Sequence, residues 1–154
     1  VLHFLEVLRD EIGWDNVKKA VKNPFKGKKI GAYYGCLLLR PGKVMEFDDP
    51  ENPKILEDFI TAIGGTPVIY AQRNECCGAY AAFEDETIPQ KRSASILANA
   101  EDMGADFLVT SCPLCRYNLI KNKGSSKLDV IYFTELLAEA LGVKDAVAKE
   151  AVNA

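Results

Sequence analysis

The five cysteines of this chain are the residues whose type and spacing point most directly to a chemical function. They fall into three groups: Cys36 alone, Cys76 with Cys77, and Cys112 with Cys115. Thiolate sulfur is a ligand for zinc and for iron–sulfur clusters, and it also attacks disulfides. Because five is an odd number, a framework of structural disulfides would leave one thiol over. We therefore expect free thiols, kept reduced in the cytoplasm, that act together.

The residues beside the cysteines favour the thiolate form and a shared target. The run 111–115 predicts a helix start with a proline in its first turn, which puts Cys112 and Cys115 on one face. Unpaired backbone N–H groups at such a helix start lower the pKa of a thiol. Gly78 permits the turn that two adjacent cysteines need to face one target, and Gly35 is expected to do the same before Cys36.

The elements that must position these cysteines follow from the apolar pattern. Four nearly continuous apolar runs predict strands buried on both faces of a parallel sheet, at 29–34, 66–70, 106–110 and 129–133. Amphipathic stretches predict helices between and after them, at about 53–63, 89–103, 112–121 and 134–142. This alternation predicts an α/β fold: a Rossmann-like open, mostly parallel sheet of about four strands with flanking helices.

The chain is predicted to form a single domain over residues 1–154. We expect a helical N-terminal lead-in at 1–24, broken near Gly13, a cysteine-rich α/β core at 28–142, and a C-terminal tail helix at 143–154. Each cysteine group follows one of the first three predicted strands. Because the carboxyl ends of parallel strands meet at one edge of the sheet, we expect all five cysteines to converge there.

Composition excludes several classes of partner. The 154 residues are 48% hydrophobic and 27% charged, with a net charge of -3, which is typical of one ordinary globular domain. Nothing in this balance points to nucleic acid or to an anionic membrane surface. No apolar run approaches the roughly 20 residues that span a bilayer, so we expect no membrane insertion. Asp48 and Asp49 are expected to form a turn and helix start rather than a catalytic carboxylate pair.

Three hypotheses account for the cysteines to different extents. A zinc-binding structural or redox domain would use four of the five thiolates. A thioredoxin-like dithiol protein would use Cys112 as nucleophile and Cys115 as resolving thiol, and it leaves the other three unexplained. An iron–sulfur cluster is favoured because five thiolates exceed the four ligands of tetrahedral zinc. The surplus over an ordinary four-iron cubane indicates either an unusual cluster or one free thiol.

The order and spacing of the cysteines, together with the residues that flank them, resemble the sequence pattern of a known family. The spacing Cys36-x39-Cys76-Cys77-x34-Cys112-x2-Cys115, with Tyr-Tyr-Gly before Cys36 and Gly78 after the pair, is similar to the cysteine-rich CCG domain. That domain occurs, usually in two copies, in the catalytic B subunit of heterodisulfide reductase and its relatives. The resemblance covers roughly residues 28 to 142.

The resemblance implies a redox function. In that family the five cysteines hold a non-cubane [4Fe-4S] cluster, so the implied cofactor and metal ligands are Cys36, Cys76, Cys77, Cys112 and Cys115. The methanogen enzyme reductively cleaves the mixed disulfide of coenzyme M and coenzyme B, a step of methanogenesis. Its electrons come from partner subunits that carry further iron–sulfur clusters and flavin. Some relatives bind zinc in one copy, and others serve succinate, lactate or glycolate oxidation.

This chain holds one cysteine set where the catalytic subunits of the family usually have two. The helical approach to Cys36 is similar to the carboxy-terminal copy, and the chain begins at Val1 within an amphipathic segment. We therefore expect a fragment that corresponds to that second copy. An oxidoreductase built in this way would need its other half and its partner subunits, so we expect no catalytic turnover from the isolated chain.

Overall fold

The computed structural model describes residues 1–143. Its sheet has four parallel strands in the order β2-β1-β3-β4, and their bounds are β1 (Lys29–Tyr33), β2 (Thr66–Val68), β3 (Phe107–Thr110) and β4 (Val130–Tyr132). The α/β fold with an open parallel sheet is confirmed, and all four predicted strand positions are correct to within two residues at each end. The tail helix predicted for 143–154 lies outside the described residues, except for Val143.

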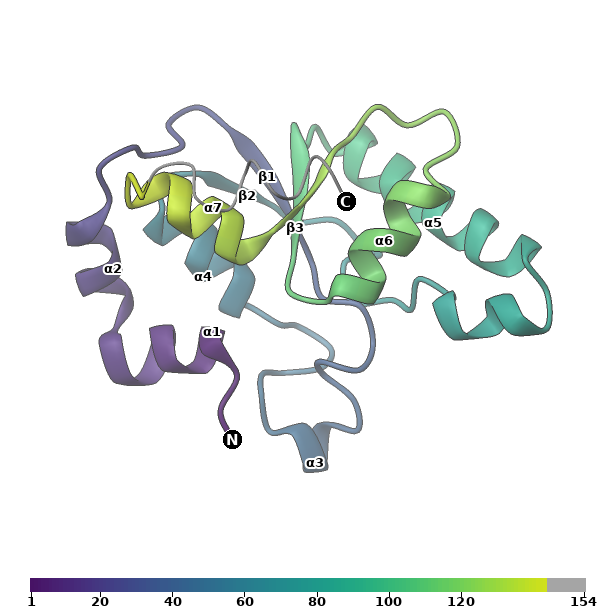
Figure 1. The fold of residues 1–154 in the computed structure, drawn as a ribbon, viewed down its shortest axis with the longest axis horizontal. Helices are drawn as coiled ribbons and strands as arrows, with labels where there is room; N and C mark the ends of the chain where they lie inside the picture. Colours follow the sequence, from purple (N-terminus) through teal and green to yellow (C-terminus); the bar gives the residue numbers. More distant parts are fainter. Residues whose placement is uncertain (144–154) are drawn as a thin grey trace.

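Helices cover both faces of this sheet (Figure 1). The helices of the described residues are α1 (Phe4–Glu6), the π-helical η1 (Val7–Ile12), α2 (Trp14–Ala20), α3 (Gly42–Met45), α4 (Ile55–Ala62), the 3₁₀ helix η2 (Ala79–Phe83), α5 (Thr87–Asp102), α6 (Pro113–Lys121) and α7 (Phe133–Ala140). The predicted break in the lead-in is confirmed at Gly13, whose φ is 81°.

Two hydrophobic cores explain why the strands are apolar along their length. One face of β1 contributes Ile30 and Ala32 to a core shared with α2, α4 and α7. The other face contributes Tyr33 to a second core, shared with α5 and α6. Because side chains alternate between the faces of a strand, a strand covered on both sides must be apolar at every position. The lead-in belongs to the first core, where Leu5 and Leu8 are buried.

The segment between β1 and α4 explains the acidic residues Asp48 and Asp49. One oxygen of Asp48 accepts hydrogen bonds from the backbone N–H groups of Lys54 and Ile55, each at 2.7 Å, at the start of α4. Asp49 accepts from the N–H of Glu51 at 2.9 Å and so closes a turn. The predicted turn and helix start are therefore confirmed.

Two short elements were not predicted from the sequence. The helices α3 and η2 have four and five residues, respectively. Neither is long enough to repeat a 3.6-residue hydrophobic period, so periodicity gives no signal for them. The helix η2 matters for the site because it starts directly after Gly78 and carries Ala79 and Tyr80.

Candidate metal centre

The strand order places the three cysteine loops around one crevice. The chain leaves β1 toward α4 on one face of the sheet, and it leaves β3 toward α6 on the other face. At the carboxyl ends of β1 and β3 the two connections therefore diverge, which is the topological switch point where open α/β sheets bind ligands. Cys36 follows β1, and Cys112 is the N-cap residue of α6 directly after β3. Cys76 and Cys77 lie between β2 and η2.

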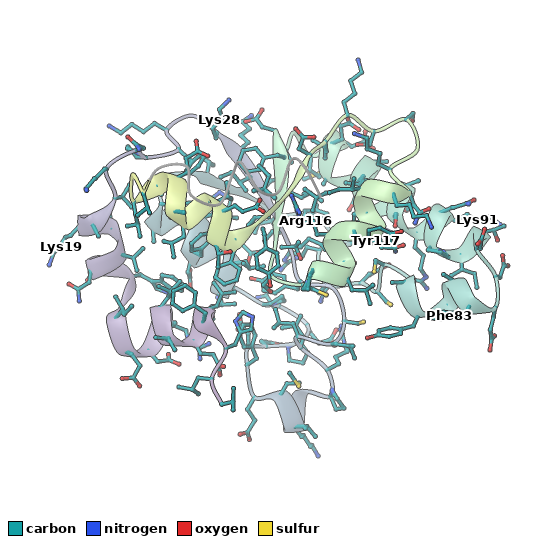
Figure 2. All side chains as sticks on the ribbon, in the orientation of Figure 1. Lys19, Lys28, Phe83, Lys91, Arg116 and Tyr117 are labelled. Carbon is teal, nitrogen blue, oxygen red and sulfur yellow. The ribbon has the colours of Figure 1, made fainter. Side chains whose placement is uncertain are left out.

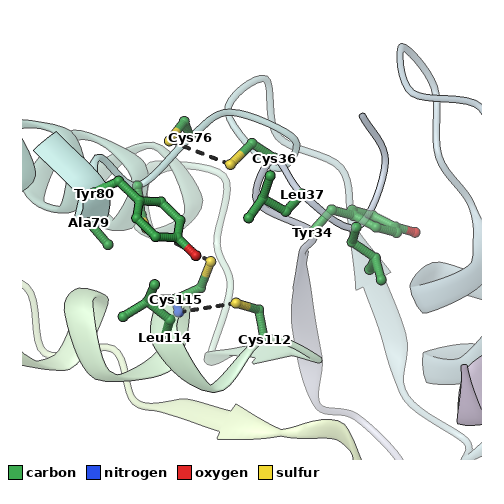
Figure 3. Close-up of a pocket in the computed structure, with 11 residues that line it drawn as sticks. Tyr34, Cys36, Leu37, Cys76, Ala79, Tyr80, Cys112, Leu114 and Cys115 are labelled. Atoms are coloured by element: carbon green, nitrogen blue, oxygen red, sulfur yellow. Dashed lines mark hydrogen bonds between the residues drawn. The ribbon is translucent and has the colours of Figure 1, made fainter. Parts of the chain in front are cut away.

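All five cysteines line a single cavity of about 70 Å³ (Figure 3). The rest of its wall is made by Tyr34, Leu37, Leu38, Ala79, Tyr80 and Leu114. The structure thus brings together every cysteine that the sequence singled out, although three loops separated by more than thirty residues carry them. Their role as metal ligands stays a prediction at this point.

Within the cavity, four of the thiols form two close pairs. The Sγ atoms of Cys36 and Cys76 are 3.6 Å apart, and those of Cys77 and Cys115 are 3.8 Å apart. The adjacent cysteines of the Cys-Cys-Gly element therefore have different partners. All five are free thiols. Among the described residues, no three His, Cys, Asp or Glu side chains are arranged as the ligands of one metal ion.

Backbone N–H groups and glycines shape this arrangement. The N–H of Gly78 donates to Cys76 Sγ at 3.3 Å, and the N–H of Cys115 donates to Cys112 Sγ at 3.4 Å. Gly78 has a φ of 79°, so the predicted turn is confirmed. At Gly35, φ is 68°, and an added Cβ would lie 2.9 Å from Cys115 Sγ. Only glycine at this position lets the chain approach the sulfur so closely.

The pKa values of the thiols diverge according to their hydrogen bonds. The pKa of Cys112 is lowered to about 6, because its sulfur accepts a hydrogen bond from the Cys115 thiol and from backbone N–H groups at the start of α6. The pKa of Cys77 is lowered to about 6 as well, chiefly by its hydrogen bond with Cys115. Correspondingly, the pKa of Cys115 is raised because its thiol keeps the shared proton. Burial, followed by the neighbouring Cys76, raises the pKa of Cys36 to about 11.

The residues present fit an iron–sulfur group. Five soft sulfur donors surround one space, and two of them, Cys77 and Cys112, ionise near pH 6 and so present thiolates at neutral pH. Leu37, Leu114 and Ala79 give the cavity apolar walls, which limit the access of water to an inorganic group. Gly35 removes the side chain that would fill the space next to Cys115.

The apolar wall residues and Asn118 were not expected from the sequence pattern. The side-chain amide of Asn118 donates to the carbonyl of Cys77 at 2.9 Å and also lies 3.3 Å from Ser93 Oγ. Asn118 is buried and connects α6 to the Cys76–Cys77 loop. Its position three residues after Cys115, on the same face of a helix, is the signal that could have identified it.

A second cavity lies on another side of α6. It has a volume of about 340 Å³ and is lined by Pro113, Arg116, Tyr117, Ile120, Tyr132 and Glu135. Arg116 and Tyr117 are visible on this side of α6 in Figure 2. Tyr80 and Tyr117 are both close in sequence to cysteines, yet only Tyr80 lines the cysteine cavity. Figure 3 shows the Tyr80 hydroxyl group directed into that cavity.

Comparison with known proteins identifies the family of this chain. Residues 30–120 match the sequence pattern of the cysteine-rich domain family CCG, and this span contains all five cysteines. The chain belongs to this family. The predicted family resemblance is therefore confirmed.

Three relatives of this chain are named as subunits of reductases. The chain is 31% identical over 137 residues to the 8-methylmenaquinol:fumarate reductase membrane anchor subunit of Wolinella succinogenes, covering 84% of this chain and 48% of the relative. It is 30% identical over 157 residues to the B subunit of the ferredoxin/F(420)H(2)-dependent CoB-CoM heterodisulfide reductase of Methanosarcina acetivorans, covering 92% and 50%. It is 26% identical over 155 residues to the B subunit of the ferredoxin:CoB-CoM heterodisulfide reductase of Methanosarcina mazei, covering 92% and 50%.

The chain spans about half the length of these relatives. Among the described residues, none of the helices is both long and apolar enough to cross a membrane. The comparisons support a redox-related CCG domain of the heterodisulfide reductase family.

The pKa values predict different alkylation profiles for two partly exposed thiols of the metal-free, reduced chain. Since the thiolate is the reactive form and roughly nine tenths of a thiol with a pKa near 6 is ionised at pH 7, Cys112 should react at a rate that is nearly constant above pH 7. The rate at Cys36 should keep rising toward pH 11. Iodoacetamide labelling followed by peptide mass spectrometry measures both rates. Faster labelling of Cys36 than of Cys112 at pH 7 would contradict the assignment.

Tyr80 and Tyr117 form a matched pair for testing the cavity wall, because they are 62% and 61% exposed. Removing the Tyr80 ring should open the cysteine cavity, so Tyr80→Ala should raise the alkylation rate of the cysteines by a bulky maleimide several-fold. Tyr117→Ala should leave the rate unchanged, since this ring lines the other cavity. Equal effects of the two substitutions would show that Tyr80 does not close the site.

Proposed function

We propose that this chain is an iron–sulfur redox domain in which Cys36, Cys76, Cys77, Cys112 and Cys115 together hold one non-cubane [4Fe-4S] cluster. The observation that carries the proposal is the convergence of all five thiols, from three separate loops, on one cavity at the switch point of the sheet. Membership of the CCG family supports it. Free thiols at all five positions suit a reducing compartment such as the cytoplasm.

The number of donors separates this proposal from a zinc site. Zinc in proteins is almost always bound by four ligands in a tetrahedron, so a fifth cysteine in the same cavity would have no metal to bind. The close pairs Cys36–Cys76 and Cys77–Cys115 engage four thiols, and Cys112 stands at the helix start as the fifth. A cluster with several irons offers a separate coordination position for each of them.

The residues of the chain have distinct tasks in this site. Cys77 and Cys112 offer thiolates at neutral pH, whereas Cys36 and Cys115 must give up their protons when they bind iron. The side chains of Leu37 and Leu114 exclude water from the cavity, and Tyr80 lies across its mouth. When bound, the cluster would supply electrons one at a time to an acceptor at this edge of the sheet.

The proposed acceptor is a disulfide formed by two thiol cofactors, of the coenzyme M–coenzyme B type. Its cleavage takes up two electrons and two protons, breaks the S–S bond and releases two thiols. Relatives named as B subunits of heterodisulfide reductases support this substrate class. In the assembled enzyme, partner subunits with iron–sulfur clusters and flavin would supply the electrons, and a second CCG domain would complete the catalytic site.

A second candidate function follows from the relative that is named as a fumarate reductase membrane anchor subunit. In such an assembly the domain would pass electrons between a quinol pool and a distant active site. The cluster would then be an electron carrier, and no disulfide would bind at the cysteine cavity. Both functions need the same cluster. They differ in whether the cluster passes its electrons to a disulfide substrate or to another electron carrier.

Cluster binding is tested by anaerobic reconstitution of the chain and of single Cys→Ser variants. The chain should bind about four irons, as an iron–sulfur domain of this kind requires. Cys76→Ser and Cys77→Ser should lose most of this iron together with the visible absorption. Ser111→Ala, which changes a buried neighbour of Cys112, serves as the control and should retain both. Full iron binding without Cys76 and Cys77 would contradict the shared site.

A single-turnover experiment on the loaded chain, combined with the second CCG domain proposed to complete its catalytic site, separates the two candidate functions without partner subunits. The loaded chain is reduced with a low-potential dye, freed from the dye and mixed with a low-molecular-weight disulfide. A disulfide-cleaving domain should be reoxidised and release two thiols for every two electrons consumed. An electron carrier should stay reduced in the presence of the disulfide and should be reoxidised only by an electron acceptor. Thiol release and the visible spectrum are followed together.

A further inference from the structure

A group of buried polar side chains lies on the side of Tyr34 that faces away from the cysteine cavity. It consists of Tyr34, Glu57, Tyr70 and Arg73, whose exposed fractions are 1%, 7%, 2% and 9%. Figure 3 shows that the Tyr34 hydroxyl points away from the cysteines, and Glu57, Tyr70 and Arg73 are not among the residues that line the cavity. The proposed redox reaction makes no use of them.

Glu57 is the centre of this group. It is a buried residue of α4. Its Oε2 accepts a hydrogen bond from the Tyr34 hydroxyl. The same hydroxyl accepts a hydrogen bond from the N–H of Leu56 at 2.9 Å. Tyr34 precedes Cys36 by two residues. Two hydrogen bonds with α4 therefore hold the Tyr34 hydroxyl at the start of the Cys36 loop.

Arg73 connects Glu57 to the second cysteine loop. Its Nε lies 3.1 Å from Glu57 Oε1. Neither atom has a partner at hydrogen-bond geometry, so the two meet as an ion pair. Arg73 also donates to Asn52 Oδ1 at 2.9 Å, and its carbonyl accepts from the N–H of Tyr34 at 2.8 Å. Arg73 precedes Cys76 by three residues.

A buried ion pair of this kind is weak evidence for a gain in fold stability. Removing a carboxylate and a guanidinium from water is costly, and an apolar pair of similar volume is often equally stable. The cost shows in Glu57, where burial raises the pKa of the carboxyl group. The Tyr70 hydroxyl is also buried without a hydrogen-bond partner. Several polar atoms of this group therefore lack hydrogen-bond partners, while its contacts reach the starts of two cysteine loops. These two properties suit a role in positioning the loops.

We propose that Glu57 is a positioning residue, which joins the Cys36 loop to the Cys76–Cys77 loop through Tyr34 and Arg73 and so holds Cys36 and Cys76 at their 3.6 Å separation. Arg40 adds an outer connection between the same loops, since its guanidinium donates to the carbonyl of Asn74 at 2.9 Å. Cys77 is held in addition by the side chain of Asn118, which lies on α6 together with Cys115, so the separation of Cys77 and Cys115 should depend less on Glu57. The role in metal binding rests on the proposed function, whereas the role in thiol geometry does not.

Thiol exchange in the metal-free, reduced chain tests the geometry directly. With oxidised glutathione, one thiolate of a pair displaces one glutathione and forms a mixed disulfide. The second thiolate then displaces the other glutathione and closes the disulfide between the two cysteines. Peptide mass spectrometry gives the rate of closure for Cys36–Cys76 and for Cys77–Cys115 in the same sample.

Glu57→Leu should slow the closure of Cys36–Cys76 about tenfold, because small displacements of reacting groups have effects of this size or larger. The closure of Cys77–Cys115 should be slowed clearly less, because Asn118 also holds Cys77, and it serves as an internal comparison. Glu57→Gln keeps an acceptor for Tyr34 and should restore part of the rate. Leu136→Ala, which creates a cavity in the same core on α7, should slow neither pair. Equal slowing of both pairs, or no slowing of either by Glu57→Leu, would overturn the proposal.

The loaded protein gives a second readout. Glu57→Leu should change the paramagnetic spectrum and the midpoint potential of the cluster, and Glu57→Gln should restore the spectrum toward that of the unsubstituted chain. Unchanged spectrum and potential in Glu57→Leu would refute the role in metal binding. If the unsubstituted chain binds no iron, the proposed function fails, but the exchange rates still decide whether Glu57 positions the two loops.

Discussion

Parallel pairing of β1 with β3 is the interaction on which the cysteine site depends. The register aligns Tyr33 with Thr110, so the two strands end side by side, and Cys36 and Cys112 follow within three residues. The connections after these strands pass to opposite faces of the sheet, which leaves a crevice between them. The apolar strands and the two cores keep this edge in place, and the loops are anchored in the same cores by buried residues such as Leu39 and Tyr70.

The pair Cys76–Cys77 must be brought to this crevice from β2, which lies at the edge of the sheet. Three groups of contacts fix its loop: Tyr33 donates its hydroxyl to the carbonyl of Glu75 at 2.8 Å, Asn118 holds the carbonyl of Cys77, and Arg73 is held through Glu57. Each contact comes from a different element, namely β1, α6 and α4. Elements packed in the core thus hold the Cys76–Cys77 loop from three directions. The thiols themselves are the groups that would carry out the chemistry.

Much of this arrangement could be predicted from the sequence, for physical reasons that differ between its parts. The strands were recognised because burial on both faces demands unbroken apolar runs, and the edge where the cysteines meet follows from parallel topology alone. The pairing of Cys36 with Cys76 and of Cys77 with Cys115 could not be predicted, because it depends on the turn at Gly78 and on contacts between distant loops. Glu57 was missed for a similar reason, since a charged residue in an amphipathic helix is normally exposed.

The central claim is that five thiols of one chain bind a single iron–sulfur cluster. Native mass spectrometry of the chain, purified and loaded without oxygen, tests it most directly because it counts the bound atoms in one intact species. The account predicts a mass increase equal to about four irons and four sulfides, with no thiol left free for alkylation while the cluster is bound. A mass increase equal to one zinc ion, with one cysteine still open to alkylation, would contradict it.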